Sequence, residues 1–88
     1  MINYTEEELK IFLEFGDRCA RCGNPSIVLH EIVPKSKRPK TWSNSDNRIP
    51  LDNDCHIWAH QRGTKRSRDE LTYLRYHSKY RISQEEIT

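Results

Sequence analysis

The sequence predicts a small α+β fold in which a β-hairpin is followed by a helix and is flanked by an N-terminal and a C-terminal helix. Short segments of β-branched and apolar residues, bounded by turn residues, alternate with longer segments of helical periodicity. The chain has 88 residues, of which 34% are hydrophobic and 32% are charged. We therefore expect a single domain over residues 1–88 with a small core, which needs further stabilisation, such as a bound metal ion.

The first expected element is a helix over about residues 5–15. Thr5 followed by Glu8 forms a capping-box pattern, and the acidic residues of the first turn suit the positive end of a helix dipole. Apolar residues recur at helical spacing until Gly16, which predicts the end of the helix there.

A turn, two strands and a long loop are expected next. The sequence CARC at 19–22 predicts a knuckle or turn, and the segment 26–31 follows an Asn-Pro turn signal and predicts a strand. Residues 34–47 are rich in Lys, Ser, Pro and Asn without periodicity, which predicts a loop of a length that is usually functional. The sequence RIPL at 48–51 predicts a second strand, and Pro50 favours an edge position for it.

Two helices are expected to complete the fold. Asp52 or Asn53 can cap a helix through the sequence CHIWAHQ, and Gly63 predicts its end. The last helix is expected at about residues 67–77, because Ser67 and the glutamate three residues later form a second capping box. The polar tail SQEEIT predicts no element.

Composition also excludes several classes of protein. The chain has no run of 18 apolar residues, and its N-terminus lacks a basic segment followed by an apolar one, so we expect a cytoplasmic protein without a membrane span or signal peptide. Three cysteines cannot all pair with one another, and the spacing in CARC is typical of a metal knuckle or a redox pair. A thiol oxidoreductase is not expected, because the βαβ pattern around such motifs is absent from the sequence.

Three histidines form the strongest candidate site. His56 and His60 are four residues apart on the expected helix, so both imidazoles lie on one face. Such a pair is by itself a weak signal of metal binding, but His30 ends the first expected strand. A helix that folds back over a hairpin can bring the three imidazoles together. Three protein ligands with open coordination positions are typical of a catalytic metal site.

The sequences LHEIVPKS, DNRIPL and DCHIWAH, in this order, resemble the HNH endonucleases and their ββα-metal fold. The resemblance covers residues 19–62, half of the chain, which would form the ββα-metal core. It consists of a His-Glu pair at the end of one strand, an Asn before the next, and a His after a cysteine at the start of a helix. The nine-residue step from Asn47 to His56, followed by His60, is similar to the pattern in colicin-type nucleases of this family.

The resemblance implies a role for each residue of the site. His30, His56 and His60 would bind one divalent cation (Mg²⁺, Mn²⁺, Ni²⁺ or Zn²⁺) that contacts the scissile phosphate. Glu31, where many members have a histidine, would be the general base, with a role as a direct metal ligand as the alternative. Asn47 would orient the base or pin the loop through hydrogen bonds to the backbone, unless it is a simple turn residue.

The resemblance also implies a structural zinc site. Many members of the family carry two CxxC knuckles, and here the second knuckle reads DNDC, with Asp52 in place of its first cysteine. Zinc accepts carboxylate oxygen, so Cys19, Cys22, Asp52 and Cys55 can form a four-ligand site. The alternative is a site that no longer binds zinc and holds free thiols.

Two groups of basic residues flank the histidines in the sequence. They are Lys35, Lys37, Arg38 and Lys40, and Arg62, Lys65, Arg66 and Arg68. Taken alone they are equally well explained as solvated loops. Beside a nuclease site they would bind DNA phosphates without reading bases.

The sequence thus predicts a metal-dependent DNA endonuclease that nicks or cuts by hydrolysis of phosphodiester bonds. The resemblance suggests a phage or bacterial setting, beside a packaging motor or in a restriction system. The alternative is a non-catalytic zinc-knuckle module that binds nucleic acid or a protein partner.

Overall fold

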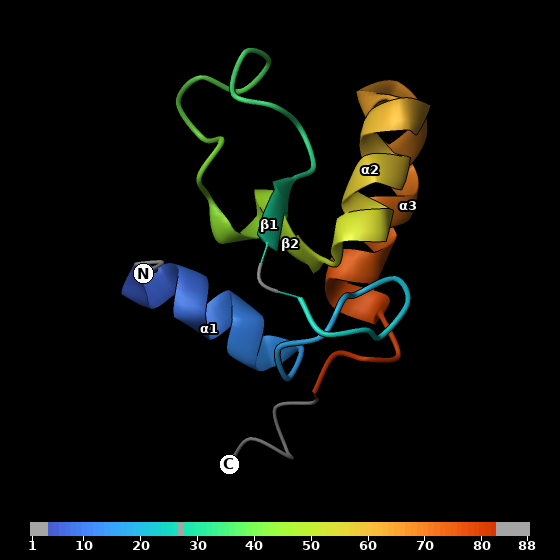
Figure 1. The fold of residues 1–88 in the computed structure, drawn as a ribbon. Helices are drawn as coiled ribbons and strands as arrows, with labels where there is room; N and C mark the ends of the chain where they lie inside the picture. The colour runs from blue at the N-terminus through green and yellow to red at the C-terminus, as the bar shows by residue number, and fades with distance from the viewer. Residues whose placement is uncertain (1–3, 27, 83–88) are drawn as a thin grey trace.

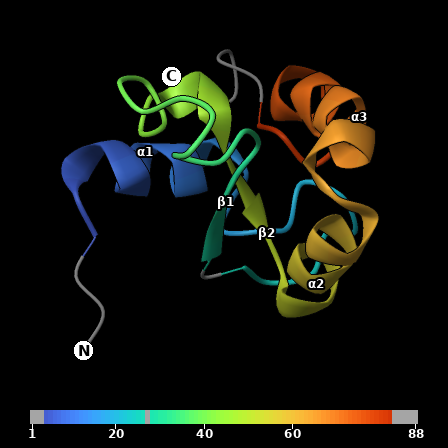
Figure 2. The same cartoon turned by 90° about the horizontal axis from the view of Figure 1, so that it is seen from above.

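The computed structural model describes residues 4–26 and 28–82. Its elements are α1 (Glu6–Glu14), β1 (Val28–Glu31), the 3-10 helix η1 (Ser45–Asn47), β2 (Arg48–Leu51), α2 (Asn53–Arg62) and α3 (Thr64–His77). The antiparallel hairpin of β1 and β2 lies between α1 on one side and the paired helices α2 and α3 on the other (Figure 1 and Figure 2). The expected α+β class, with a hairpin followed by a helix and flanked by helices, is confirmed for the described residues.

The first helix begins as its capping box predicts. The Thr5 hydroxyl accepts a hydrogen bond from the Glu8 amide at 3.2 Å, and the Glu8 carboxylate accepts one from the Thr5 amide at 2.7 Å. Phe15 is the C-cap, and Gly16 follows with a φ of 60°. The expected range of 5–15 therefore differs from the helix by one residue at each end.

The hairpin register places His30 and Glu31 next to each other at one end of the sheet. His30 pairs with Ile49, and Glu31 pairs with Arg48 at the end of the sheet. Because side chains alternate along a strand, His30 and Glu31 project to opposite faces. β1 begins at Val28, which is later than the predicted start of this strand, and Ile27 lies outside the described residues.

The joint between the last two helices corrects the sequence prediction. α2 has the expected N-cap, Asp52, and ends at Gly63, but α3 starts at Thr64 and not at Ser67. Gly63 has a φ of 88°, a conformation that suits glycine, and one residue is enough to reverse the chain. Ser67 lies buried inside α3, where its hydroxyl donates to the Gly63 carbonyl at 2.9 Å, so the apparent capping box is not used.

The long segment between the strands is also corrected in part, because it ends in the 3-10 turn η1. The polar tail at 83–88 lies outside the described residues. α3 is 14 residues long, and none of the described helices has the length and apolar character needed to cross a membrane.

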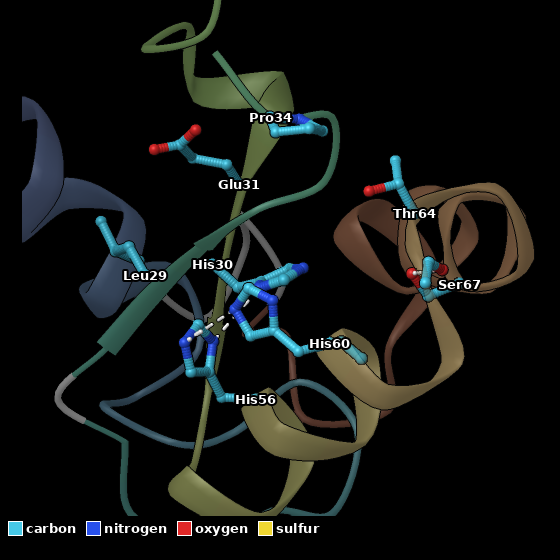
Figure 3. A pocket seen from close by; sticks show the side chains of 10 residues that line it. Leu29, His30, Glu31, Pro34, His56, His60, Thr64 and Ser67 are labelled. Atoms are coloured by element: carbon cyan, nitrogen blue, oxygen red, sulfur yellow. Dashed lines mark hydrogen bonds between the residues drawn. The ribbon is translucent and has the colours of Figure 1, made fainter. Parts of the chain in front are cut away.

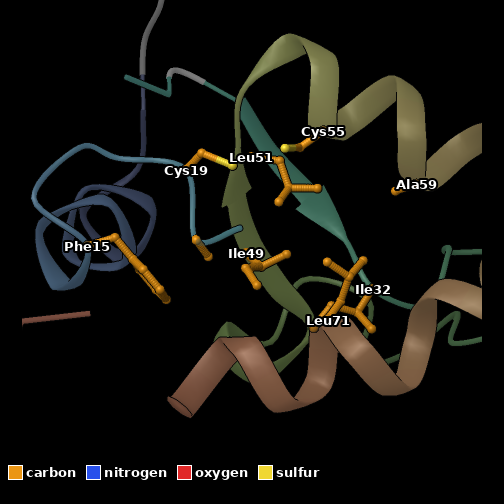
Figure 4. Packing of buried hydrophobic residues seen from close by; sticks show 9 residues of the cluster. Phe15, Cys19, Ile32, Ile49, Leu51, Cys55, Ala59 and Leu71 are labelled. Carbon is orange, nitrogen blue, oxygen red and sulfur yellow. The ribbon is translucent and has the colours of Figure 1, made fainter. Parts of the chain in front are cut away.

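The core is small and lies between β2 and the helices (Figure 4). Ile49 and Leu51 of β2 are fully buried, and Leu71 of α3 packs against the same cluster. Cys19 and Cys55 are part of this cluster, on either side of Leu51. A pair of buried cysteines therefore closes one end of the core.

Candidate metal centres

The three histidines meet at one point. His30 comes from the hairpin, and His56 and His60 come from successive turns of α2 (Figure 3). The Nδ1 atoms of His30 and His56 are 3.1 Å apart, and the Nε2 atoms of His56 and His60 are 3.2 Å apart. One ligand nitrogen from each ring lies within 4.8 Å of the other two. The predicted convergence of three imidazoles is confirmed.

Exposure increases across this histidine cluster. His30 is 7% exposed, His56 is half-buried and His60 is exposed. Burial, together with the neighbouring His56 and His60, lowers the pKa of His30 to about 4. Burial and His60 also lower the pKa of His56. Both shifts favour the neutral imidazole, which is the form that binds a metal ion.

The donors and their surroundings fit a divalent cation with open positions. Imidazole nitrogens bound to one tetrahedral zinc ion at 2.0–2.1 Å lie roughly 3.4 Å apart, close to the separations found here. His56 uses a different nitrogen toward each neighbour, so a metal ion would draw these rings into a slightly altered arrangement. The cluster opens into a pocket of about 370 Å³ that Thr64 and Ser67 of α3 also line. The pocket therefore leaves room for a further ligand on the side of a bound ion that the three histidines do not occupy.

Glu31 lies beside the histidine cluster without joining it. Its side chain lines the same pocket but points to the other side of the strand (Figure 3). One carboxylate oxygen accepts a hydrogen bond from the Lys35 amide at 3.2 Å. Among the described residues the ligand group here consists of the three histidines, so the conformation found does not support Glu31 as a direct ligand. Its role as a base stays a prediction.

Asn47 pins the loop, as one of its predicted roles requires. Its side-chain oxygen accepts a hydrogen bond from the Val33 amide at 2.9 Å, and its nitrogen donates to the carbonyls of Val33 and Trp42 at 2.8 and 2.9 Å. Asn47 is 1% exposed, so these bonds are shielded from water. They close the loop directly after Glu31, which makes Asn47 more than a simple turn residue.

The cysteine cluster brings together the four predicted ligands. One ligand atom each of Cys19, Cys22, Asp52 and Cys55 lies within 4.8 Å of the other three. The two oxygens of Asp52 have separate partners: Oδ1 accepts from the Cys55 amide at 2.9 Å, and Oδ2 accepts from the Cys22 thiol at 3.1 Å. Asp52 can therefore cap α2 and face a metal ion at the same time.

Burial and hydrogen bonds shift the pKa values of this cluster upward for two of its thiols and downward for its carboxylate. Burial raises the pKa of the Cys55 thiol, and the neighbouring Asp52 carboxylate raises it further. Burial and Asp52 also raise the pKa of Cys22. Although burial opposes it, hydrogen bonds from Cys55, Cys22 and Asn24 hold the pKa of Asp52 well below its usual range. Thiols of this kind lose their protons when a zinc ion binds them.

Each of the two basic groups is partly paired with acidic residues. Arg38 lies 3.8 Å from Asp46, Arg62 lies 3.5 Å from Glu70, and Arg68 lies 3.7 Å from Asp69. The remaining basic residues are exposed and form no ion pair within the described part of the chain. They are Lys35, Lys37, Lys40, Lys65 and Arg66. Lys35 directly follows Pro34 and Lys65 directly follows Thr64 in the chain, and both Pro34 and Thr64 line the pocket.

One residue that sequence reasoning missed is Arg21. It lies between the two cysteines of CARC, and its guanidinium approaches the Cys55 sulfur at 3.6 Å. The sequence offers one signal only, a basic residue inside the knuckle. Its contact with Trp58 joins segments that are far apart in the chain, and no local pattern indicates it.

Comparison with known proteins leaves both clusters to be judged on their own chemistry. No protein-family model matches the chain, and no curated protein or solved structure matches it significantly.

Proposed function

We propose that the protein is a metal-dependent DNA endonuclease of the HNH type. The observation that carries the proposal is the convergence of His30, His56 and His60 at an open pocket between a hairpin and a helix. Three imidazole donors on one side and free space on the other suit a metal ion that must also bind substrate. The order of residues along the chain also supports the proposal, because it resembles that of the HNH endonucleases. These residues are Glu31, Asn47 and the two helix histidines.

The protein side of the mechanism follows from the positions of these residues. The histidines would hold a divalent cation, which would supply Lewis-acid stabilisation of the phosphate charge when bound. Glu31 borders the same pocket, and with its side chain turned from the Lys35 amide toward the histidines its carboxylate would accept a proton from the attacking water. Asn47 fixes the loop that follows Glu31 and thereby limits where that carboxylate can lie.

Basic side chains in the two segments that follow Pro34 and Thr64 would hold the DNA backbone. Lys37, Lys40, Lys65 and Arg66 are exposed and have no acidic partner within the described residues, so their charges are available to phosphates. Binding of this kind releases counterions and weakens steeply as salt is raised. It carries little sequence information.

The cysteine cluster supports this fold as a zinc site. Its four donors and the two buried cysteines at the end of a small core fit a closed structural site. Zinc there would stabilise the start of α2, the helix that carries two of the three histidines.

Cleavage of supercoiled plasmid tests the proposal. The purified protein is incubated with plasmid, first with chelator and then with Mg²⁺, Mn²⁺, Ni²⁺ or Zn²⁺. We expect no nicking with chelator and recovery with at least one cation, because imidazole ligands accept several first-row metals. The matched variants are His56→Ala, which should be inactive, and His77→Ala, which changes an exposed histidine outside the cluster. A protein that binds zinc and DNA but never nicks would be the non-catalytic zinc-knuckle module instead.

A further inference from the structure

Arg21 makes contacts at the cysteine cluster that no role assigned so far explains. Its backbone amide donates to the Cys19 sulfur at 3.4 Å, and its Nη1 donates to the Cys55 sulfur at 3.6 Å. Two of the cluster's sulfurs therefore receive a hydrogen bond from this one residue. No other cationic side chain in the described part of the chain reaches a sulfur of the cluster.

The same side chain reaches both helices that border the pocket. Its guanidinium carbon lies 3.8 Å from the centre of the Trp58 ring on α2, and its Nε lies 3.3 Å from a carboxylate oxygen of Glu70 on α3. Arg62 approaches the same ring at 5.2 Å and the same carboxylate at 3.5 Å. Arg21 thus joins the knuckle to α2 and α3 through one planar group.

These contacts differ from an ordinary surface ion pair. The Arg21 side chain is 35% exposed and that of Glu70 is 39% exposed, and a pair at this level contributes little stability by itself. A guanidinium can do more, because its fixed fork donates in two directions while its face stacks on an aromatic ring. Three partners on two helices, Cys55 and Trp58 of α2 and Glu70 of α3, therefore set its position.

The net charge of the cysteine cluster with zinc bound explains what the contact between Arg21 and Cys55 can do. Three thiolates and one carboxylate around a zinc ion leave a net charge of about −2 on the site. Cys55 is buried, so water does little to solvate its sulfur. A cation that donates to this sulfur reduces the cost of holding the charge, as hydrogen bonds from outside the ligand shell do at other metal sites.

We infer that Arg21 is a positioning residue of the cysteine cluster, whose guanidinium balances the charge of the metal-bound thiolates and fastens the cluster to α2 and α3. The inference rests on the proposed zinc binding at this cluster. In this inference the contact with Cys55 raises the affinity for zinc. The contacts with Trp58 and Glu70 hold the knuckle against α2 and α3.

The test measures zinc and cobalt binding and does not depend on nuclease activity. Zinc affinity is measured by competition with a coloured chelator, and Co²⁺ is used for the sulfur-to-metal absorption band. We expect Arg21→Gln to lower zinc affinity by roughly 10–100-fold. The Co²⁺ band should move to longer wavelength, because a sulfur that loses a hydrogen bond gives up its electrons more easily. Arg21→Lys keeps the charge and should recover most of the affinity.

Two further variants separate the parts of the inference. Arg18→Gln removes the same charge from an exposed position three residues earlier and should bind zinc like the parent. Glu70→Gln leaves the contact with Cys55 in place and should also keep its affinity and its Co²⁺ band. Equal losses in Arg18→Gln and Arg21→Gln, or in Glu70→Gln and Arg21→Gln, would overturn the charge-balance role. If the parent itself binds neither ion, it is the zinc site of the proposed function that is wrong.

Discussion

The cysteine cluster and the histidine cluster both take ligands from α2. The first is partly buried in the core, whereas the second opens into a pocket. Asp52 is the N-cap of α2 and Cys55 lies in its first turn. His56 and His60 follow further along the same helix. The cysteine cluster has four donors, and two of its cysteines are buried in the core. The histidine cluster has three donors and opens through His60 into a pocket.

In the proposed function, this difference separates a structural metal site from a reactive one. A closed set of four ligands leaves no position for substrate, whereas three ligands at an open pocket leave room for one. Each cluster also has a distinct partner beyond its ligands: Arg21 donates to Cys55, and Glu31 lies beside His30. We therefore expect damage to one cluster to affect folding and damage to the other to affect chemistry.

The largest expected effect is the loss of cleavage in His60→Ala. Two remaining imidazoles hold a divalent ion poorly. Cleavage and the binding of a metal ion at the histidine cluster should therefore both fall below detection. Zinc content should stay at about one ion per chain, and the melting temperature should stay near that of the parent, because His60 is exposed. Plasmid nicking, elemental analysis and thermal melting measure the three quantities. Loss of zinc in this variant would break the separation between the clusters.

Glu31→Gln should give the next largest effect, on rate alone. The amide keeps the shape of the side chain and can still hydrogen-bond water, but it cannot accept a proton. Cleavage should slow by roughly 10²–10⁴-fold with metal and DNA binding nearly unchanged. Single-turnover nicking rates and calorimetric metal titration measure both. A matching collapse of metal affinity would make Glu31 a ligand, and an unchanged rate would assign the base elsewhere.

Cys22→Ser tests the structural side of the comparison. Zinc that binds only the folded chain stabilises it by about 4 kcal/mol when its concentration is 1,000 times its dissociation constant, so losing the site should lower stability by a similar amount. Chemical unfolding with and without zinc measures the difference. The control is Asp52→Cys, which restores a thiolate and should keep its zinc, although it loses the carboxylate cap of α2. If Cys22→Ser unfolds like the parent and the parent carries no zinc, the cluster is a set of free thiols.

Local patterns account for the parts of the fold that the sequence predicts well. The Thr5 and Glu8 capping box, the two strands and the Asp52 cap all depend on neighbours within a few residues. The capping pattern at Ser67 fails, because a hydroxyl inside a helix can donate to the preceding turn instead. The packing of the helices and the φ of Gly63 decide whether Ser67 caps a helix or lies inside one.

The same distinction applies to the sites. The spacing of His56 and His60 is readable on the helix, and adding His30 requires only the order of strand and helix. The direction of Glu31 depends on the rotamer and on the Lys35 amide, and the contacts of Arg21 depend on how α2 and α3 pack. Residues whose roles depend on packing between distant segments are the ones that sequence reasoning misses.

The smallest expected effect is a pH dependence of stability that His30 causes. Its pKa is about 4 in the fold and about 6.5 in an unfolded chain, so between these values the unfolded chain binds more protons. The free energy of unfolding should therefore fall as pH drops through this window and stop falling, as far as His30 is concerned, below pH 4. Solvent in the open pocket screens part of the effect. Urea unfolding with one equivalent of zinc, at pH 7.5 to 5, should show a steeper loss in the parent than in His30→Gln. His77→Gln, outside the cluster, should follow the parent; equal slopes in the parent and His30→Gln would mean that His30 is as free to take up a proton as an exposed histidine.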